Sequence, residues 1–123
     1  MRAGDTFRLR NVADKHTWVI VSDPDQDAGR VLCVAFTSWS VNKDPACIVE
    51  VEEFSILTNR SCIDYFDVKI ASVAALTAGA AKGLIQQRAP VPPELLARIR
   101  HGFNVSRDVP FEHIEFLIRQ NLI

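Results

Sequence analysis

The sequence has no long hydrophobic run, and this shortage excludes a class of protein. The longest uninterrupted apolar run, residues 31–36, is far shorter than the ~20 residues that a helix needs to cross a bilayer. The first residues, Met-Arg-Ala-Gly-Asp-Thr, contain no apolar segment of the kind found in secretion signals. We therefore expect a cytoplasmic protein with no membrane segment.

Cysteine is also scarce, with Cys33, Cys47 and Cys62 as the only three. An odd count does not fit a fully paired disulfide framework, and no two cysteines are separated by two residues as zinc ligands often are. Each cysteine lies in an apolar or strand-like stretch. This pattern favours reduced thiols in the core of a cytosolic protein, and we predict no metal site.

Excess charge is missing too, because the formal net charge is −1. A nearly neutral chain does not suit a protein that coats nucleic acid without selectivity. The distribution is nevertheless uneven, since residues 82–107 contain five basic residues against the single acidic residue Glu94. This segment predicts a locally positive surface for a phosphate backbone or an acidic protein, and a solvated helix face is the alternative.

The first 71 residues contain several short segments with the alternation and β-branched content of strands. Polar turns with proline and glycine separate them. We expect strands over residues 6–10, 16–21, 30–38 and 47–51, and one or two more over residues 61–70. So many short strands in so short a stretch predict a small, strongly bent antiparallel barrel or sandwich.

Residues 72–123 have mainly helical patterns. Ser72 can cap a first helix, the prolines of residues 90–93 indicate a hinge followed by a second helix, and Asp108 can cap a third over residues 110–121. We therefore predict one α+β domain over residues 1–123. It is mainly β, with an antiparallel barrel over residues 1–71 and a C-terminal extension of about three helices over residues 72–123.

Four short anchors in these strands give the chain a resemblance to a known family. Gly4 and Asp5 lead into the first strand, residues 17–21 read Thr-Trp-Val-Ile-Val, and Thr37-Ser38 closes the third strand. Residues 48–51, Ile-Val-Glu-Val, are similar to the strand that follows. In this order the anchors resemble the MazF/PemK family of toxin ribonucleases, and the resemblance covers roughly residues 3–76.

The resemblance implies a fold, an activity and partners. The fold is an SH3-like β-barrel, usually homodimeric, and the activity is cleavage of single-stranded RNA without a metal or another cofactor. In that chemistry the ribose 2′-hydroxyl attacks the adjacent phosphate and leaves a 2′,3′-cyclic phosphate. A cognate antitoxin protein is the partner expected to occupy the RNA groove.

The resemblance also implies catalytic residues. The family uses an arginine just before the second strand and a threonine or serine at the end of the third, which Thr37 and the neighbouring Ser38 match. His16 stands where the family has arginine. An imidazole exchanges protons at neutral pH, which a guanidinium hardly does, but it lacks the bidentate phosphate grip of arginine. The alternatives are proton transfer by His16 and a barrel without nuclease activity.

Three further residues are candidates for binding substrate. Lys15 precedes His16, and Lys43 lies in the loop after the third strand, where either lysine can contact phosphate. Trp39 can stack on a base, or it can pack against a dimer partner at the barrel rim.

Two functions of other classes stay open. The first is a catalytically inert SH3-like barrel that binds a protein or a nucleic acid through its C-terminal helices. The second is DNA binding by those helices, although the gap from Phe103 to Pro110 exceeds the 3–4 residues of a helix-turn-helix.

Overall fold

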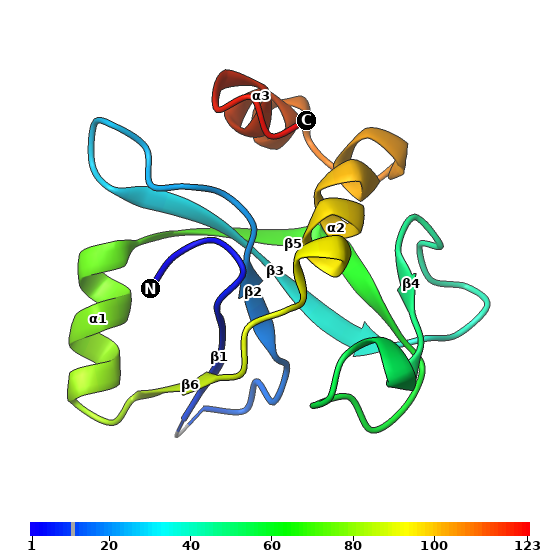
Figure 1. Ribbon diagram of the computed structural model, residues 1–123, viewed down its shortest axis with the longest axis horizontal. Coiled ribbons are helices and arrows are strands. Elements are labelled where there is room, and N and C mark those ends of the chain that lie inside the picture. Colours follow the sequence, from blue (N-terminus) through cyan, green and yellow to red (C-terminus); the bar gives the residue numbers. More distant parts are fainter. Residues whose placement is uncertain (11) are drawn as a thin grey trace.

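A six-stranded antiparallel sheet is the centre of the computed structural model, which describes residues 1–10 and 12–123 (Figure 1). Three α-helices and one short 3-10 helix accompany the sheet in this part of the chain. The strands are β1 (Thr6–Leu9), β2 (Trp18–Ile20), β3 (Arg30–Ser38), β4 (Ile48–Val49), β5 (Ser61–Ser72) and β6 (Ile85–Arg88). The helices are α1 (Val73–Ala81), α2 (Pro93–Val105) and α3 (Phe111–Arg119), and η1 (Val51–Glu53) follows β4.

The strand order explains why β2 and β3 are hydrophobic on both faces. The hydrogen-bonded order is β4-β5-β3-β2-β1-β6, so β2 and β3 occupy the middle of the sheet. The pairs formed by the described strands do not join β4 to β6. The predicted α+β class is confirmed, and the sheet is antiparallel as expected. The described strands number six, and their pairing does not show the closed barrel that the sequence predicted.

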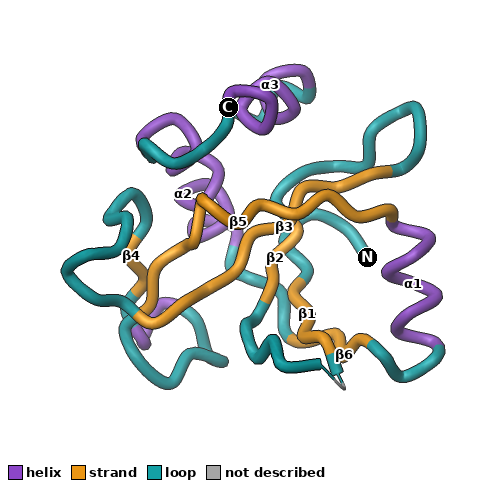
Figure 2. The backbone as a smooth tube through the Cα atoms, turned by 180° about the vertical axis from the view of Figure 1, so that it is seen from behind, coloured by secondary structure: helices purple, strands orange, loops and turns teal. Residues whose placement is uncertain are grey.

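Helices cover the sheet on both faces, as the views from the front and from behind show (Figures 1 and 2). Val19, Leu32 and Val34 belong to a cluster that includes residues of α2 and α3. Their neighbours Trp18 and Cys33 belong to a second cluster that includes Leu76 of α1. Because successive side chains of a strand point to opposite faces, a strand covered on both sides must be apolar at nearly every position.

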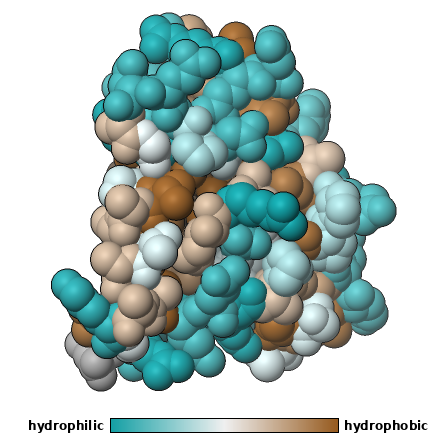
Figure 3. Space-filling view, turned by 60° about the vertical axis from the view of Figure 1, so that its left-hand side comes forward, coloured by the Kyte–Doolittle hydropathy of each residue, from teal (hydrophilic) through white to brown (hydrophobic). Residues whose placement is uncertain are grey.

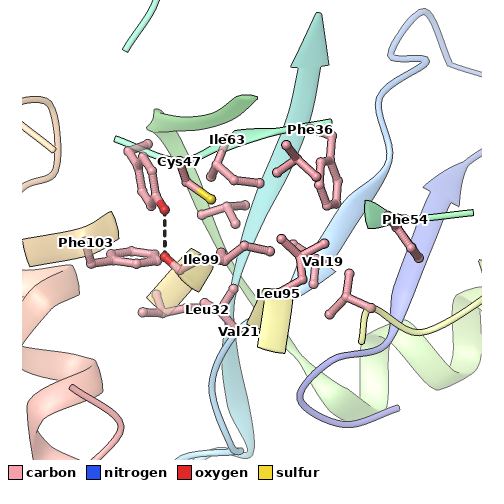
Figure 4. Packing of buried hydrophobic residues seen from close by; sticks show 14 of the residues in the cluster. Val19, Val21, Leu32, Phe36, Cys47, Phe54, Ile63, Leu95, Ile99 and Phe103 are labelled. Atoms are coloured by element: carbon pink, nitrogen blue, oxygen red, sulfur yellow. Dashed lines mark hydrogen bonds between the residues drawn. The ribbon is translucent and has the colours of Figure 1, made fainter. Parts of the chain in front are cut away.

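Helix α2 packs closely against β5 through Tyr65. The Tyr65 hydroxyl donates a hydrogen bond of 2.6 Å to the carbonyl of Ile99, and its ring lies edge-on to that of Phe103 with centroids 5.0 Å apart (Figure 4). A Cβ atom at Gly102 would lie 1.8 Å from this hydroxyl oxygen. Gly102 is therefore required for the close approach of the helix to the sheet.

The other face of the sheet has a thinner cover. The alanine-rich helix α1 lies there, and Figure 3 shows hydrophobic residues on this side of the molecule with hydrophilic ones around them. Trp18 is 2% exposed, and the ammonium of Lys69 lies 5.3 Å from its ring centroid. The prediction that Trp18 is a core or interface residue therefore corresponds to a buried position in the core.

The helix boundaries agree with the sequence at two ends and differ at a third. Ser72 caps α1 by accepting a hydrogen bond of 3.0 Å from the Ala75 backbone N–H, as predicted. Helix α2 begins at Pro93, which is also where the prolines place it. The predicted cap by Asp108 is wrong, because Pro110 is the N-cap residue of α3 and makes no side-chain cap.

Sequence reasoning missed η1, because residue 51 was expected to end a strand, and it also missed strand β6. Strand β6 lies inside the segment predicted to be a helical extension, and it pairs with β1 at four positions from Thr6–Arg88 to Leu9–Ile85. Its sequence, Ile-Gln-Gln-Arg, is short and has little strand preference of its own. Pairing with β1 therefore determines its conformation.

The basic residues of residues 82–107 do not form one free surface. The Arg98 guanidinium donates a hydrogen bond of 2.7 Å to the Ile48 carbonyl and forms an ion pair with Glu53. Arg100 donates a hydrogen bond of 2.7 Å to the Val21 carbonyl, and burial lowers the pKa of its guanidinium. Both arginines tie α2 to the sheet.

None of the helices formed by the described residues is long and apolar enough to span a membrane.

We expect Gly102→Ala to destabilise the protein by about 1–3 kcal/mol, since the new methyl group overpacks the contact with Tyr65. Gly79→Ala in α1 is the matched control. Its Cβ would lie 2.8 Å from Cδ1 and 3.1 Å from Cγ1 of the Ile85 side chain, which is flexible, and would meet no backbone atom among its nearest neighbours. Urea unfolding of both variants measures the difference, and equal free energies of unfolding would contradict the tight α2–β5 contact.

The three cysteines are free and buried, as predicted. Burial raises the pKa of the Cys33 thiol to about 12 and that of Cys47 to about 11, and it also raises that of Cys62. Because the thiolate is the reactive form, we expect folded protein to resist iodoacetamide between pH 7 and 9. Mass spectrometry should find three alkylated thiols after unfolding in urea. An Ala78→Cys variant should be alkylated rapidly at its exposed site, and rapid alkylation of a native thiol would contradict the burial.

Candidate functional site

The start of β2 and the end of β3 lie side by side. The Phe36 backbone N–H donates a hydrogen bond of 2.9 Å to the Thr17 carbonyl, next to the strand pair formed by Trp18 and Ala35. This pairing places His16, just before β2, close to Thr37, near the end of β3. The two sequence segments singled out for chemistry therefore meet at one edge of a rigid sheet.

A groove of about 480 Å³ lies at this meeting point. Its volume falls within the ~300–1,000 Å³ that is usual for small-ligand sites. In the part of the chain that the structure describes, its lining includes no carboxylate. The lining consists of cationic, hydroxyl, amide and apolar side chains together with one imidazole, from Arg8, Lys15, His16, Thr17, Phe36, Thr37, Ser38, Lys43, Ile56, Leu57, Thr58, Asn59, Ser61 and Arg88.

Five of the six residues proposed from the sequence line this groove, and Trp39 does not. His16, Thr37, Ser38, Lys15 and Lys43 are brought together from three separate segments. The half-buried Trp39 donates its backbone N–H to the Arg60 carbonyl at 3.0 Å. Its role in stacking stays a prediction.

Lys43 holds the hydroxyl residues at the end of β3. Its ammonium donates hydrogen bonds of 3.0 Å to the Thr37 hydroxyl oxygen and 2.5 Å to the Ser38 carbonyl. The Asn59 amide donates to the Ser38 hydroxyl oxygen at 3.2 Å. Both hydroxyl oxygens are acceptors in these contacts, so their O–H groups stay available to donate to an anion.

Two arginines of the groove were not among the residues proposed from the sequence. Arg8 comes from β1 and Arg88 from β6, and the Arg88 guanidinium lies 3.4 Å from the Thr17 hydroxyl. The polar alternation of β1 was a signal for Arg8, since it sets Arg8 apart from the buried Phe7. Arg88 had no such signal, because its position depends on the unpredicted pairing of β6 with β1.

Asp14 contacts His16 at the edge of the groove. Its Oδ1 accepts a hydrogen bond of 2.8 Å from the His16 backbone N–H and lies 2.9 Å from His16 Nδ1, and its Oδ2 accepts one of 3.0 Å from the Trp18 indole. Partial burial raises the pKa of the Asp14 carboxyl, but these hydrogen bonds and the nearby His16 hold it below its ordinary value of 3.8. Asp14 is therefore ionised at neutral pH.

The groove is suited to an anion. Lys and Arg side chains attract phosphate, and Arg can bind it with two parallel hydrogen bonds. Four such cations line the groove together with donors of three other kinds, namely several hydroxyls, an amide and an imidazole. The described residues contain no group of three or more His, Cys, Asp or Glu side chains that could hold a metal ion.

Comparisons of this chain with protein-family models, with curated proteins and with solved structures found no match.

We expect tripolyphosphate to bind in the groove, since four cations line it. Arg88→Gln should weaken binding about tenfold, because a hydrogen bond to a charged group contributes about 1.5–3 kcal/mol. Arg107→Gln, at an exposed position on the C-terminal side of α2, is the matched control and should bind like wild type. NMR titration gives both the affinity and the residues that shift, and shifts outside the groove would contradict this assignment.

Proposed function

We propose that this protein is an endoribonuclease that cleaves single-stranded RNA without a metal ion and leaves 2′,3′-cyclic phosphate ends. The observation that carries the proposal is the composition of the groove, which is lined by four cationic side chains, an imidazole and several hydroxyls, with no carboxylate in the described lining. Cleavage of this kind needs a base for the ribose 2′-hydroxyl and donors for the charge that develops on the phosphorane.

The residues of the groove divide between these tasks. His16 acts on the proton of the 2′-hydroxyl, because an imidazole exchanges protons at neutral pH. Thr37 and Ser38 donate their hydroxyls to the phosphate, and Lys43 orients Thr37 through the 3.0 Å hydrogen bond between them. The neighbouring phosphates are bound by Arg8, Lys15 and Arg88, which make the phosphate contacts that an imidazole cannot make.

We further propose that the protein acts as a toxin of the MazF/PemK type. In this proposal the sheet corresponds to an SH3-like barrel, the protein is a homodimer, and a cognate antitoxin protein occupies the groove. The four anchors in the sequence support this assignment. So does the position of His16 beside Thr37, because two residues required by the same chemistry are then within reach of one substrate.

The test is incubation of the purified protein with a mixed-sequence single-stranded RNA in EDTA, followed by analysis of the fragment ends. We expect fragments that end in cyclic phosphate. His16→Ala should lower the cleavage rate about 10²- to 10⁴-fold, as loss of a general base does. Thr37→Ala should also cleave more slowly.

His101→Ala is the matched control, since His101 is exposed on α2 and does not line the groove. It should cleave like wild type. RNA binding without cleavage by the wild-type protein would support the inert binding module instead, and equal cleavage by wild type and His16→Ala would contradict the role of His16.

A further inference from the structure

We propose that Asp14 is a positioning residue that makes His16 a general base, with Nε2 as the atom that takes the proton. This inference rests on the proposed ribonuclease function and adds a residue to it. Nothing in the sequence motifs pointed to Asp14, which lies in the loop before β2.

The tautomer of His16 follows from the chemistry of its neighbour. An ionised carboxylate only accepts hydrogen bonds, so the 2.9 Å contact between Asp14 Oδ1 and His16 Nδ1 requires the proton on Nδ1. A neutral imidazole carries one proton, and Nε2 therefore keeps its lone pair. With Nδ1 engaged by Asp14, Nε2 is the ring nitrogen left to accept a proton from substrate.

The carboxylate is itself held in place from the core. Its other oxygen accepts a hydrogen bond of 3.0 Å from the indole N–H of Trp18, a residue that is 2% exposed. The His16 backbone N–H binds Oδ1 as well, which closes a tight local turn. Three hydrogen bonds thus hold the Asp14 carboxylate, and one of them joins it to the imidazole of His16, whose side chain is 54% exposed.

The charged groups near His16 come from several elements of the fold. Asp14 and Lys15 lie in the same loop, Arg8 comes from β1, Arg88 from β6 and Lys43 from the loop after β3. Among the described residues, Asp14 is the one carboxylate bonded to the ring, so it offsets the cationic side chains when the imidazolium forms.

Water is the co-reactant of the cleavage step. Nε2 takes the proton of the ribose 2′-hydroxyl, the 2′-oxygen forms a bond to phosphorus, and the bond from phosphorus to the 5′-oxygen breaks. The departing 5′-oxygen takes a proton from water, and the resulting hydroxide removes the proton from the imidazolium. The Asp14 carboxylate stabilises that imidazolium and stays ionised.

The first test does not depend on RNA. Nitrogen-15 NMR of the neutral His16 ring should show the Nδ1–H tautomer in wild-type protein and a shift toward Nε2–H in Asp14→Ala. Asp27→Ala is the matched control, because it removes an exposed carboxylate that makes no contact with His16, and it should keep the wild-type tautomer. A wild-type ring that is protonated at Nε2 would overturn the proposal.

The second test uses the cleavage assay. Asp14→Ala should lower kcat at least about tenfold with KM changed less than twofold, and it should move the acid limb of the pH–rate profile. Asp14→Glu should recover part of the rate, since it keeps a carboxylate. If wild type and Asp14→Ala cleave equally, the positioning role is wrong and the nuclease function stands. If wild type does not cleave, the proposed function fails and with it the catalytic role, whereas the NMR result still decides the tautomer.

Discussion

The burial of β2 and β3 on both faces is the constraint on which the rest of the structure depends. Each of these central strands contacts α2 or α3 through one set of side chains and the α1 layer through the other. Burying one large apolar side chain contributes about 1.5–3 kcal/mol, so two covered faces stabilise the sheet far more than one. The strand ends therefore have little freedom to move, and the polar residues attached to them are held in a fixed arrangement.

The candidate site follows directly from that rigidity. Antiparallel pairing places the start of β2 beside the end of β3, which sets His16 near Thr37. Trp18 connects the hydrophobic core to the candidate site, because its ring lies in the core and its indole N–H donates a hydrogen bond to Asp14. The exposed imidazole is consequently oriented by a residue that the hydrophobic core keeps in place.

The positive charge of the groove has a different origin from the charge pattern of the sequence. The basic residues concentrated in residues 82–107 suggested a single surface, yet Arg98 and Arg100 bind backbone carbonyls and fasten α2 to the sheet. Arg88 is the member of that segment that reaches the groove, and Arg8 joins it from the N-terminal strand. Local counts of charge could not separate these roles, because each depends on which element lies opposite the side chain.

The sequence alone determined the α+β class, the buried thiols, the cap at Ser72 and the hydroxyl step Thr37-Ser38, since each depends on local pattern or composition. It also brought His16 and Lys43 into consideration. Only the tertiary structure decided that β6 joins the sheet, that Arg8 and Arg88 share one groove, and that Trp39 lies outside its lining. The reason is physical. Contacts between residues as distant in sequence as Thr6 and Arg88 arise from strand pairing, and the sequence of a short strand with weak strand propensity does not indicate which strand it pairs with.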